Sequence, residues 1–367
     1  MRALLFGTYD TAMHPRIATI GEGLRAAGVD VAECNAPLGL DTAARVDMLA
    51  RPWRAAGLIL RLASRWTTLA RTARRQPRPD VVVVGYLGHF DVLLARLLFR
   101  RIPIVLDHLV GASDTGRDRR LDGGLRETAL RLIDSAALRA ADVIVVDTQE
   151  HLEALPPRHR TRAVVVPVGA PAEWYAAARE GTRPDGPLRV VFYGLYTPLQ
   201  GTPVIGAALG QIAQAPVEIT MIGNGQDLAE TRSAAAGNDA VSWTDWVQAA
   251  DLPAVVADHD VCLGIFGTGP KALRVVPNKV FQGAAAGCAI VTSDTPPQRR
   301  ALGDAAVLVP PGDAEALATA LIRLADDRSE LARLRTASHC LATDRYAPRQ
   351  VVAPLLERLA VSCRRGT

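Results

Sequence analysis

The basic side chains of this 367-residue chain are strongly biased in type. Of its 42 basic residues 40 are arginines, and the two lysines, Lys271 and Lys279, lie close together with Arg274 between them. A lysine ammonium group is a compact charge suited to phosphate oxygens, and an arginine guanidinium group offers a planar fork of donors. These three cations predict a clamp for a phosphate-bearing ligand. The simpler alternative is a solvated basic helix face.

The segment around the lysines has a sequence typical of an anion site. A β-branched run at 261–265 is followed by a glycine-containing loop and then by a helical pattern that opens near Pro277. Proline is favourable in a first helical turn. Asn278 and Lys279 would then stand at a helix N-terminus, where free N–H groups and a partial positive charge attract an anion. We therefore expect a diphosphate here.

Short β-branched runs alternate with long helical patterns along the whole chain. Continuous valine runs such as 81–84 indicate strands buried on both faces, as in parallel sheets. The fold class predicted is α/β, with two Rossmann-like, doubly wound domains that face a cleft. The strands are expected at 2–6, 29–33, 81–84, 103–107, 143–146 and 164–166, and again at 189–193, 217–222, 240–243, 261–265, 289–292 and 306–309.

A Pro- and Gly-rich segment divides the chain. We expect a first domain at 1–170, a linker at 171–187, a second domain at 188–345, and a last helix at 346–367 that could pack back across the junction. The first half carries a net charge of +6 and the second −2, which favours different partners for the two. Open parallel sheets bind ligands at the carboxyl ends of their strands, so the site is expected in the cleft.

Composition excludes several classes of protein. An apolar content of 49% is that of a globular chain, not a disordered one. No apolar run approaches the length of a transmembrane helix, and no signal peptide is expected. Five scattered cysteines without a CxxC pair argue against a disulfide framework or a zinc site and favour a cytoplasmic location. Nucleic-acid binding is not expected, because the aromatic residues are not interleaved with the basic ones.

Four segments of the second half form a recognisable series: VVFYGLYTPLQGTPVIGAAL (190–209), TMIGNGQDL (220–228), VSWTDWVQAADLPAVVADHDVCLGIF (241–266) and PNKVFQGAAAGCAIVTSD (277–294). They resemble the donor domain of retaining, nucleotide-sugar-dependent glycosyltransferases of the GT-B fold (glycosyl transferases group 1). In order, they are similar to the strand–Gly–helix opening, the Ile-Gly-Asp/Asn-Gly turn, the base-binding loop, and the Glu-Ala-Met-Ala-Cys-Gly helix of that group. The first half is matched more loosely, at 14–31 and 164–170.

The resemblance implies a set of donor-binding residues: Gly194, Gln200, Gly201, Gly223, Asn224, Gly225, Trp246, Val247, Lys271, Val276, Pro277, Asn278 and Gln282. Many members carry Arg and Lys for the diphosphate where this chain has Leu195 and Gln200, and two glutamates where it has Arg274 and Gln282. We expect that the charge has moved to Lys271, Arg274 and Lys279, of which Arg274 and Lys279 act in catalysis. The Gln282 amide could still bind ribose hydroxyls.

Candidate residues in the first half follow the expected strands. Gly7, Thr8, Tyr9, Arg16 and His89 are assigned to the acceptor side, and Arg16 could reach the diphosphate. Relatives often carry a histidine near acceptor and sugar, and His108, or else Asp107, matches it best. The alternative for both histidines is a structural role in a loop.

Residues 48–79 hold eight arginines and no acidic residue. An apolar helical face (Leu58, Ile59, Leu62, Trp66, Leu69 and Ala73) lies opposite a basic one, so that Arg51–Arg78 could contact the anionic inner face of a membrane. The alternative is a domain helix with an arginine-rich solvent face.

The resemblance implies transfer of a sugar from a nucleoside-diphosphate donor, UDP-sugar favoured, to a hydroxyl or amine acceptor, with retention. No cofactor is expected, and no metal, since no DxD motif stands at a strand end. A lipid-linked or other small-molecule acceptor is open. Alternatives are a pseudo-glycosyl coupling enzyme or a sugar-nucleotide epimerase on the same scaffold and, from another class, a non-catalytic GT-B partner protein.

Overall fold

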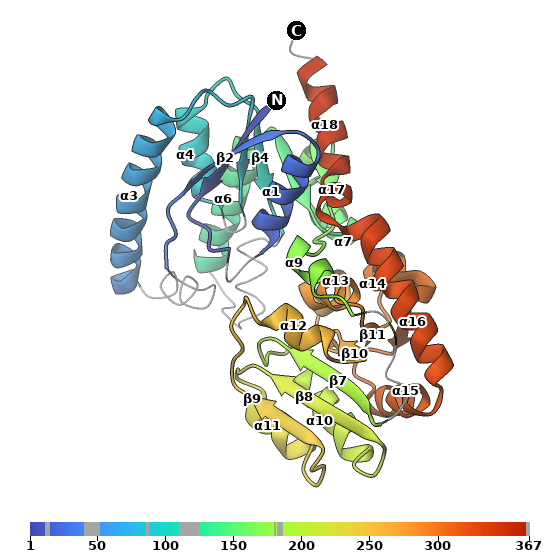
Figure 1. The fold of residues 1–367 in the computed structure, drawn as a ribbon. Helices are drawn as coiled ribbons and strands as arrows, with labels where there is room; N and C mark the ends of the chain where they lie inside the picture. Colours follow the sequence, from blue (N-terminus) through green and yellow to red (C-terminus); the bar gives the residue numbers. More distant parts are fainter. Residues whose placement is uncertain are drawn as a thin grey trace. The chain divides into compact units, whose positions relative to one another are not determined.

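The structure is a computed structural model that describes residues 1–11, 15–39, 52–85, 88–109, 125–179, 181 and 186–364. The chain divides into two compact units, Met1–Pro167 with Val351–Thr367, and Val168–Gln350. Each unit contains one parallel sheet of six strands with helices on its two faces (Figure 1). This agrees with the predicted doubly wound architecture.

The first unit is built on the sheet order β2-β1-β3-β4-β5-β6. Its strands are β1 (Arg2–Gly7), β2 (Asp30–Asn35), β3 (Val81–Val84), β4 (Ile104–Asp107), β5 (Val143–Val146) and β6 (Ala163–Val165). Its helices are α1 (Arg16–Ala26), α3 (Pro52–Arg75), α4 (Asp91–Leu98), α6 (Leu125–Ala140), α7 (Gln149–Ala154), α8 (Pro157–Arg160) and α18 (Ala353–Arg364).

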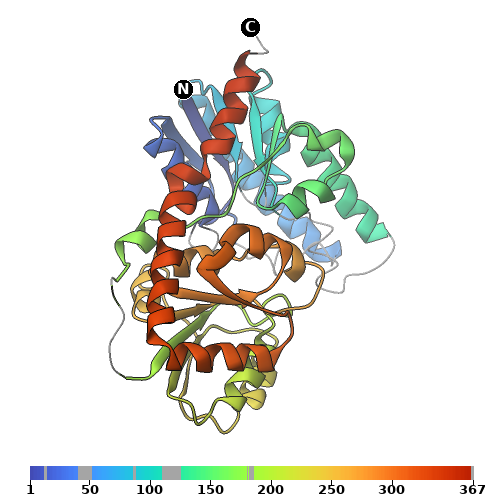
Figure 2. The same ribbon diagram turned by 90° about the vertical axis from the view of Figure 1, so that its right-hand side faces the viewer.

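The valine run of β3 explains how this sheet is buried. Val82 and Val84 join a core with α3, α4 and α6, whereas Val81 and Val83 join a second core with α1 and α18. Successive side chains of a strand point to opposite faces, so a strand with helices on both sides needs apolar residues at every position. Figure 2 shows α18 lying against the face of this sheet.

The second unit has the sheet order β12-β11-β10-β7-β8-β9. Its strands are β7 (Leu188–Tyr193), β8 (Val217–Ile222), β9 (Val241–Thr244), β10 (Val261–Leu263), β11 (Ala289–Ser293) and β12 (Ala306–Val309). Its helices are α9 (Ala172–Ala176), α10 (Thr202–Gln211), α11 (Leu228–Ala234), α12 (Leu252–Ala257), α13 (Asn278–Ala285), α14 (Pro296–Leu302), α15 (Ala314–Asp326), α16 (Arg328–Leu341) and α17 (Pro348–Val351), with shorter turns η1 (Ala272–Arg274), η2 (Gly303–Ala305) and η3 (Ala342–Tyr346).

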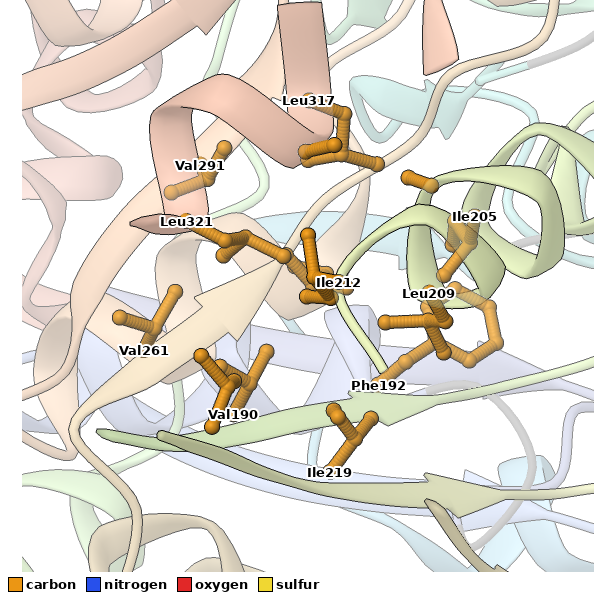
Figure 3. Packing of buried hydrophobic residues seen from close by; sticks show 14 of the residues in the cluster. Val190, Phe192, Ile205, Leu209, Ile212, Ile219, Val261, Val291, Leu317 and Leu321 are labelled. Atoms are coloured by element: carbon orange, nitrogen blue, oxygen red, sulfur yellow. The ribbon is translucent and has the colours of Figure 1, made fainter. Parts of the chain in front are cut away.

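One face of the second sheet carries the largest core of this unit (Figure 3). Alternate residues of the strands, such as Val190, Ile219 and Val291, pack against α10 and α15. Leu209 and Leu321 close this core from the helix side, and both are fully buried. On the opposite face α13 packs on β10 and β11. The sequence pattern therefore placed all twelve strands within about two residues of their observed bounds.

Two boundaries differ from the prediction. The segment 171–187 is not simply a linker, because it contains α9, whose Trp174 is 4% exposed and stacks on Tyr193. The second unit ends at Gln350, and the last helix belongs to the first unit through Leu355 and Leu359. A five-residue helix anchored by one tryptophan carries too little periodicity to be recognised in a Pro- and Gly-rich stretch.

Helix α3 uses its apolar side within the first unit. Leu69 and Ala73 are buried, and Trp66 packs against the same core while its indole Nε1 donates to Asp91 at 2.9 Å. The side chains of Leu58 and Ile59 lie outside the described residues. The helix is therefore a domain helix with an arginine-rich outer face.

Candidate functional site

The strand order of the second unit creates a switch point between β7 and β10. The chain proceeds from β7 to β8 and β9 on one side and then returns to place β10 on the other side of β7. In open parallel sheets, the crevice at the carboxyl ends of two such strands is where ligands bind. Here that place is formed by the loops 194–201 and 264–271 and by the starts of α10 and α13.

Glycines let these loops approach one another closely. Gly201, the N-cap of α10, has φ of 64°, and a Cβ at this position would lie 2.4 Å from the backbone nitrogen of Gly267. Gly223 has φ of 124°, and its Cβ would lie 1.9 Å from the carbonyl oxygen of Gly194. A side chain at either position would force the loops apart. The backbone N–H of Phe266 donates to the carbonyl of Gln200 at 2.9 Å, which ties the two loops together.

The side chain of Lys279 ends at this switch point. Lys279 lies in the first turn of α13 and is 5% exposed. Its ammonium Nζ donates to Oε1 of Gln200 at 2.5 Å and stands 3.8 Å from the ring centroid of Phe192. A Cβ on Gly194 would lie 3.0 Å from the same Nζ, so the glycine leaves room for the ammonium group. The one lysine that is buried thus lies where the strands β7 and β10 diverge.

Burial changes the acid–base behaviour of this lysine. Loss of hydration lowers the pKa of Lys279 to about 7, and the nearby Cys262 thiol acts weakly in the opposite direction. No carboxylate among the described residues forms an ion pair with it. A buried ammonium group held by one amide and the faces of aromatic rings is suited to an anion that arrives from outside the protein.

The other predicted cations are placed differently. Lys271 immediately precedes η1 and is half-buried, whereas Arg274 ends η1 and is exposed. Asn278 is exposed at the first position of α13, after the N-cap Pro277 and the buried Val276. Of the three predicted cations, Lys279 is the one whose contacts, with Gln200 and Phe192, place it at the switch point.

Gln282 and Trp246 occupy two different environments. Gln282 is 6% exposed, and its Oε1 accepts from the Tyr193 hydroxyl at 3.0 Å, so its amide is positioned by β7. Trp246 follows β9 and is 66% exposed, and the neighbouring Val247 is half-buried. On the turn after β8, Asn224 Oδ1 accepts from the backbone N–H of Gly225 at 2.7 Å. An exposed indole at this edge of the sheet can stack on a planar ring.

In the first unit, Asp91 fixes the loop that follows β1. Its Oδ2 accepts from the backbone N–H of Thr8 at 2.7 Å and from the Thr8 hydroxyl at 2.8 Å. Gly7, Thr8 and Tyr9 are all buried, and the Tyr9 hydroxyl donates to Glu33 at 2.9 Å. This loop lies between the ends of β1 and β3, the switch point of the first sheet.

The prediction that Arg16 reaches a diphosphate is wrong. Its Nε donates to both oxygens of Asp107, at 2.8 and 3.0 Å, and its two terminal nitrogens donate to the carbonyls of Pro167 and Val166. Arg16 is 2% exposed and Asp107 is 1% exposed. Burial raises the pKa of Asp107, and the Arg16 charge opposes this rise. The pair joins α1 to β4 and the end of β6, so Asp107 is a structural partner and His108 is the better catalytic candidate.

His108 and His89 lie together beside this pair. Their ring centroids are 5.3 Å apart in an edge-to-face arrangement, and His89 Nε2 lies 3.4 Å from Asp134 of α6. Burial, and then the neighbouring His89, lowers the pKa of His108 to about 3, so the imidazole is neutral at physiological pH. Among the residues that the structure describes, Nδ1 of His108 has no hydrogen-bond partner. A neutral, buried ring nitrogen of this kind can bind a hydroxyl group.

The sequence analysis missed two contributors to these sites: the Phe192 ring that holds the Lys279 ammonium group, and Asp134, which faces His89. Gln200 was assigned to donor binding, but its contact with Lys279 was not predicted. No local sequence signal could have suggested these contacts, because each of them joins distant parts of the chain.

Comparison with known proteins agrees with this fold. Residues 187–327 match the family model described as glycosyl transferases group 1. No curated protein matches the sequence. The fold resembles sucrose-phosphate synthase from Thermosynechococcus elongatus, with a TM-score of 0.70 and 14% identity over 100% of this chain and 99% of that one.

Two further solved structures share the fold. HepE from Anabaena in complex with UDP-glucose gives a TM-score of 0.68 at 14% identity over 98% of this chain and 100% of its own. An α,α-trehalose-phosphate synthase (UDP-forming) from Burkholderia xenovorans, in complex with glucose-6-phosphate, gives 0.69 at 13% identity over 98% and 100%. Residues 187–327 of this chain therefore match the glycosyl transferases group 1 family, and its two units have the architecture of the GT-B fold.

Proposed function

We propose that this protein transfers a sugar from a nucleoside-diphosphate donor, with UDP-sugar favoured, to a hydroxyl or amine acceptor, with retention and without a metal ion, in the cytoplasm. The second unit binds the donor and the first binds the acceptor. The observation that carries the proposal is the buried Lys279 ammonium group at the β7–β10 switch point, in a region that matches the family model. The UDP-glucose complex of the structurally similar HepE favours the uridine donor.

The proposed chemistry follows from the charges that develop. When the bond between the sugar and the diphosphate breaks, negative charge grows on the leaving phosphate, and the ring becomes oxocarbenium-like. Lys279 and the N–H groups that open α10 and α13 are preorganised to stabilise that negative charge. The exposed Trp246 ring is assigned to stack on the base, and the Gln282 amide to face the ribose or sugar. Positioning and charge stabilisation then supply most of the rate acceleration.

Nucleotide binding tests the donor assignment. UDP should raise the melting temperature of the full chain, because a ligand that binds only the folded state stabilises it by mass action, by about 2.7 kcal/mol at a concentration 100 times Kd. A panel of UDP, GDP, ADP and the free nucleosides identifies the base, and the nucleosides serve as controls without a diphosphate. No shift with any diphosphate would contradict the proposal. Binding without donor hydrolysis or transfer would instead support the non-catalytic alternative, for which Leu195 and Gln200 stand at the family's cation positions.

The low pKa of Lys279 predicts a pH dependence for donor capture. Below pH of about 7 the free enzyme carries a charged ammonium group, and above it the group becomes neutral and no longer attracts the diphosphate. The kcat/KM for the donor should therefore fall about tenfold per pH unit above that pKa, whereas kcat falls at a higher pH because the bound anion raises the pKa. Initial rates across this pH range measure both. In a Lys279→Arg variant that retains activity, kcat/KM should not fall above pH 7, because arginine stays charged. A kcat/KM of the unchanged protein that does not vary with pH would contradict the prediction.

A further inference from the structure

The outer face of α3 is a dense positive surface on the first unit. The helix covers its sheet with Leu69 and Ala73, which leaves the opposite side exposed. The exposed arginines in its described part are Arg61, Arg65, Arg71, Arg74 and Arg75. The helix places these five guanidinium groups close together on about four turns, although like charges at this spacing repel one another.

In the described part of the chain, no acidic side chain is paired with these arginines. The sequence has no Asp or Glu from 48 to 79. None of the five arginines forms an ion pair or hydrogen bond with another side chain in the part of the chain that the structure describes, whereas arginines elsewhere, such as Arg2, Arg96 and Arg333, are paired with carboxylates. The surface is therefore open to an anionic partner.

The helix is held firmly in this orientation. Trp66 donates through Nε1 to Oδ1 of Asp91, whose other oxygen binds Thr8. The indole ring is thus turned toward the unit and is not available on the outer face. The outer face instead offers Leu60, which is 72% exposed, beside Arg61.

We propose that this face docks the protein on an anionic lipid bilayer, with the arginines on the phosphates and Leu60 in the headgroup region. Charge complementarity favours an anionic partner, and an exposed leucine among arginines favours lipid over nucleic acid, for which a stacking aromatic would be expected. The contact is peripheral: no helix in the described residues is long and apolar enough to cross a bilayer. Because the apolar side of α3 is buried in the core, the attachment depends mainly on charge and is weakened by salt.

Vesicle co-sedimentation tests the docking surface. The full chain should bind vesicles of phosphatidylcholine with phosphatidylglycerol at low salt, and bind vesicles of phosphatidylcholine alone weakly. Arg71→Glu/Arg75→Glu should reduce binding to the anionic vesicles at least tenfold. The control Arg345→Glu/Arg349→Glu makes the same charge change at exposed arginines of the second unit and should retain binding. Equal loss in both variants, or no binding by the unchanged protein, would overturn the proposal.

A second variant separates a lipid surface from a general polyanion surface. Leu60→Gln keeps every charge, so it should weaken vesicle binding several-fold but leave binding to a heparin column unchanged. If Leu60→Gln binds vesicles as tightly as the unchanged protein, while the α3 double variant loses heparin and vesicles alike, the face is a polyanion surface and the lipid assignment fails. Melting temperature with and without UDP in each variant reports folding and donor binding, so failure here is distinguishable from failure of the proposed glycosyl transfer.

Discussion

Replacing Lys279 by methionine should remove most of the transfer activity and at the same time make the unliganded protein more stable. Loss of one preorganised charge at a developing anion typically costs a factor of about 100 to 1,000 in kcat. The stabilisation arises because methionine fills the same buried volume without a desolvated charge. Turnover at saturating donor, together with chemical unfolding of the unliganded protein, measures both effects.

The sign of the stability change follows from linkage. The folded-state pKa of Lys279 is about 7, whereas in the unfolded chain the pKa of a lysine is about 10.5. Below pH 7 both states are protonated, so the folded state carries the whole cost of the buried charge, about 3 to 5 kcal/mol at 1.36 kcal/mol per pK unit. Between the two pKa values the folded state loses its proton first and the cost declines. The advantage of Lys279→Met should therefore be large at pH 6 and small above pH 10.

The other lysine of the chain provides a matched control. Lys271 is half-buried, so Lys271→Met should change stability far less than Lys279→Met. A reciprocal exchange tests position: Lys279→Gln/Gln200→Lys returns an ammonium group to the same contact from the other side, because the two side chains meet there at 2.5 Å. The double variant should be at least tenfold more active than Lys279→Gln alone. A Lys279→Met protein with normal turnover, or with lower stability at pH 6, would contradict the assignment.

Local chemistry explains what the sequence could predict. Strands such as β3 and β5 are continuous valine and isoleucine runs bounded by polar or small residues, so their bounds follow from composition. Gly201 and Gly223 were expected from the resemblance to group 1 glycosyltransferases, and both have the positive φ that favours glycine. The anion site stays a prediction, made from the two lysines that stand out in an arginine-rich chain and from the helix N-terminus expected near Pro277.

Long-range pairing explains what the sequence could not predict. The contact that orients Lys279 joins residues 79 positions apart, and the one that engages Arg16 joins residues 91 positions apart. Nothing near Arg16 in the sequence distinguishes a buried arginine from one that faces a ligand. The same holds for α9, which depends on the stacking of Trp174 on Tyr193. Partners of this kind depend on the fold as a whole.

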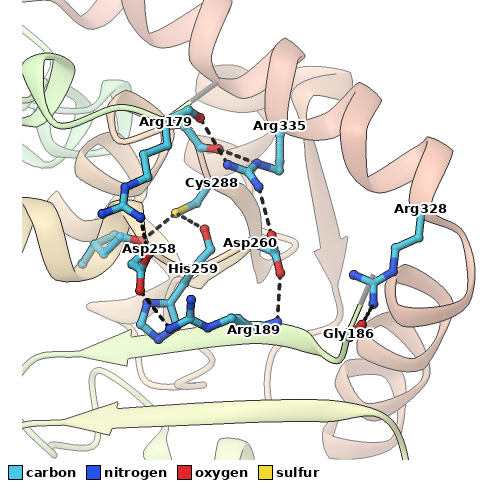
Figure 4. A network of polar contacts seen from close by, with 11 residues as sticks. Arg179, Gly186, Arg189, Asp258, His259, Asp260, Cys288, Arg328 and Arg335 are labelled. Carbon is cyan, nitrogen blue, oxygen red and sulfur yellow. Dashed lines mark hydrogen bonds and ion pairs between the residues drawn. The ribbon is translucent and has the colours of Figure 1, made fainter. Parts of the chain in front are cut away.

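Replacing Arg335 by leucine should destabilise the second unit by about 3 to 5 kcal/mol, since it leaves a buried carboxylate without its counter-charge. Arg335 donates to Asp260 Oδ1 at 2.9 Å and to the carbonyls of Gly287 and Arg179, and the side chains of the pair are 9% and 6% exposed (Figure 4). The other oxygen of Asp260 accepts from the backbone N–H of Arg189 at 3.0 Å. The pair thus joins α16 to the starts of β7 and β10.

Two further variants separate charge from packing in this network. Arg335→Leu/Asp260→Asn removes the orphaned charge but keeps an acceptor for the Arg189 N–H, so it should recover a large part of the lost free energy of unfolding. Arg333→Leu, at an exposed pair with Glu330 on the same helix, should have little effect. Asp260 stands at the amino ends of the strands, opposite the edge where Lys279 lies, so donor KM should stay unchanged well below the melting temperature. An Arg335→Leu protein as stable as the parent would mean that solvent reaches the Asp260 carboxylate, and the proposed burial of this charge would be wrong.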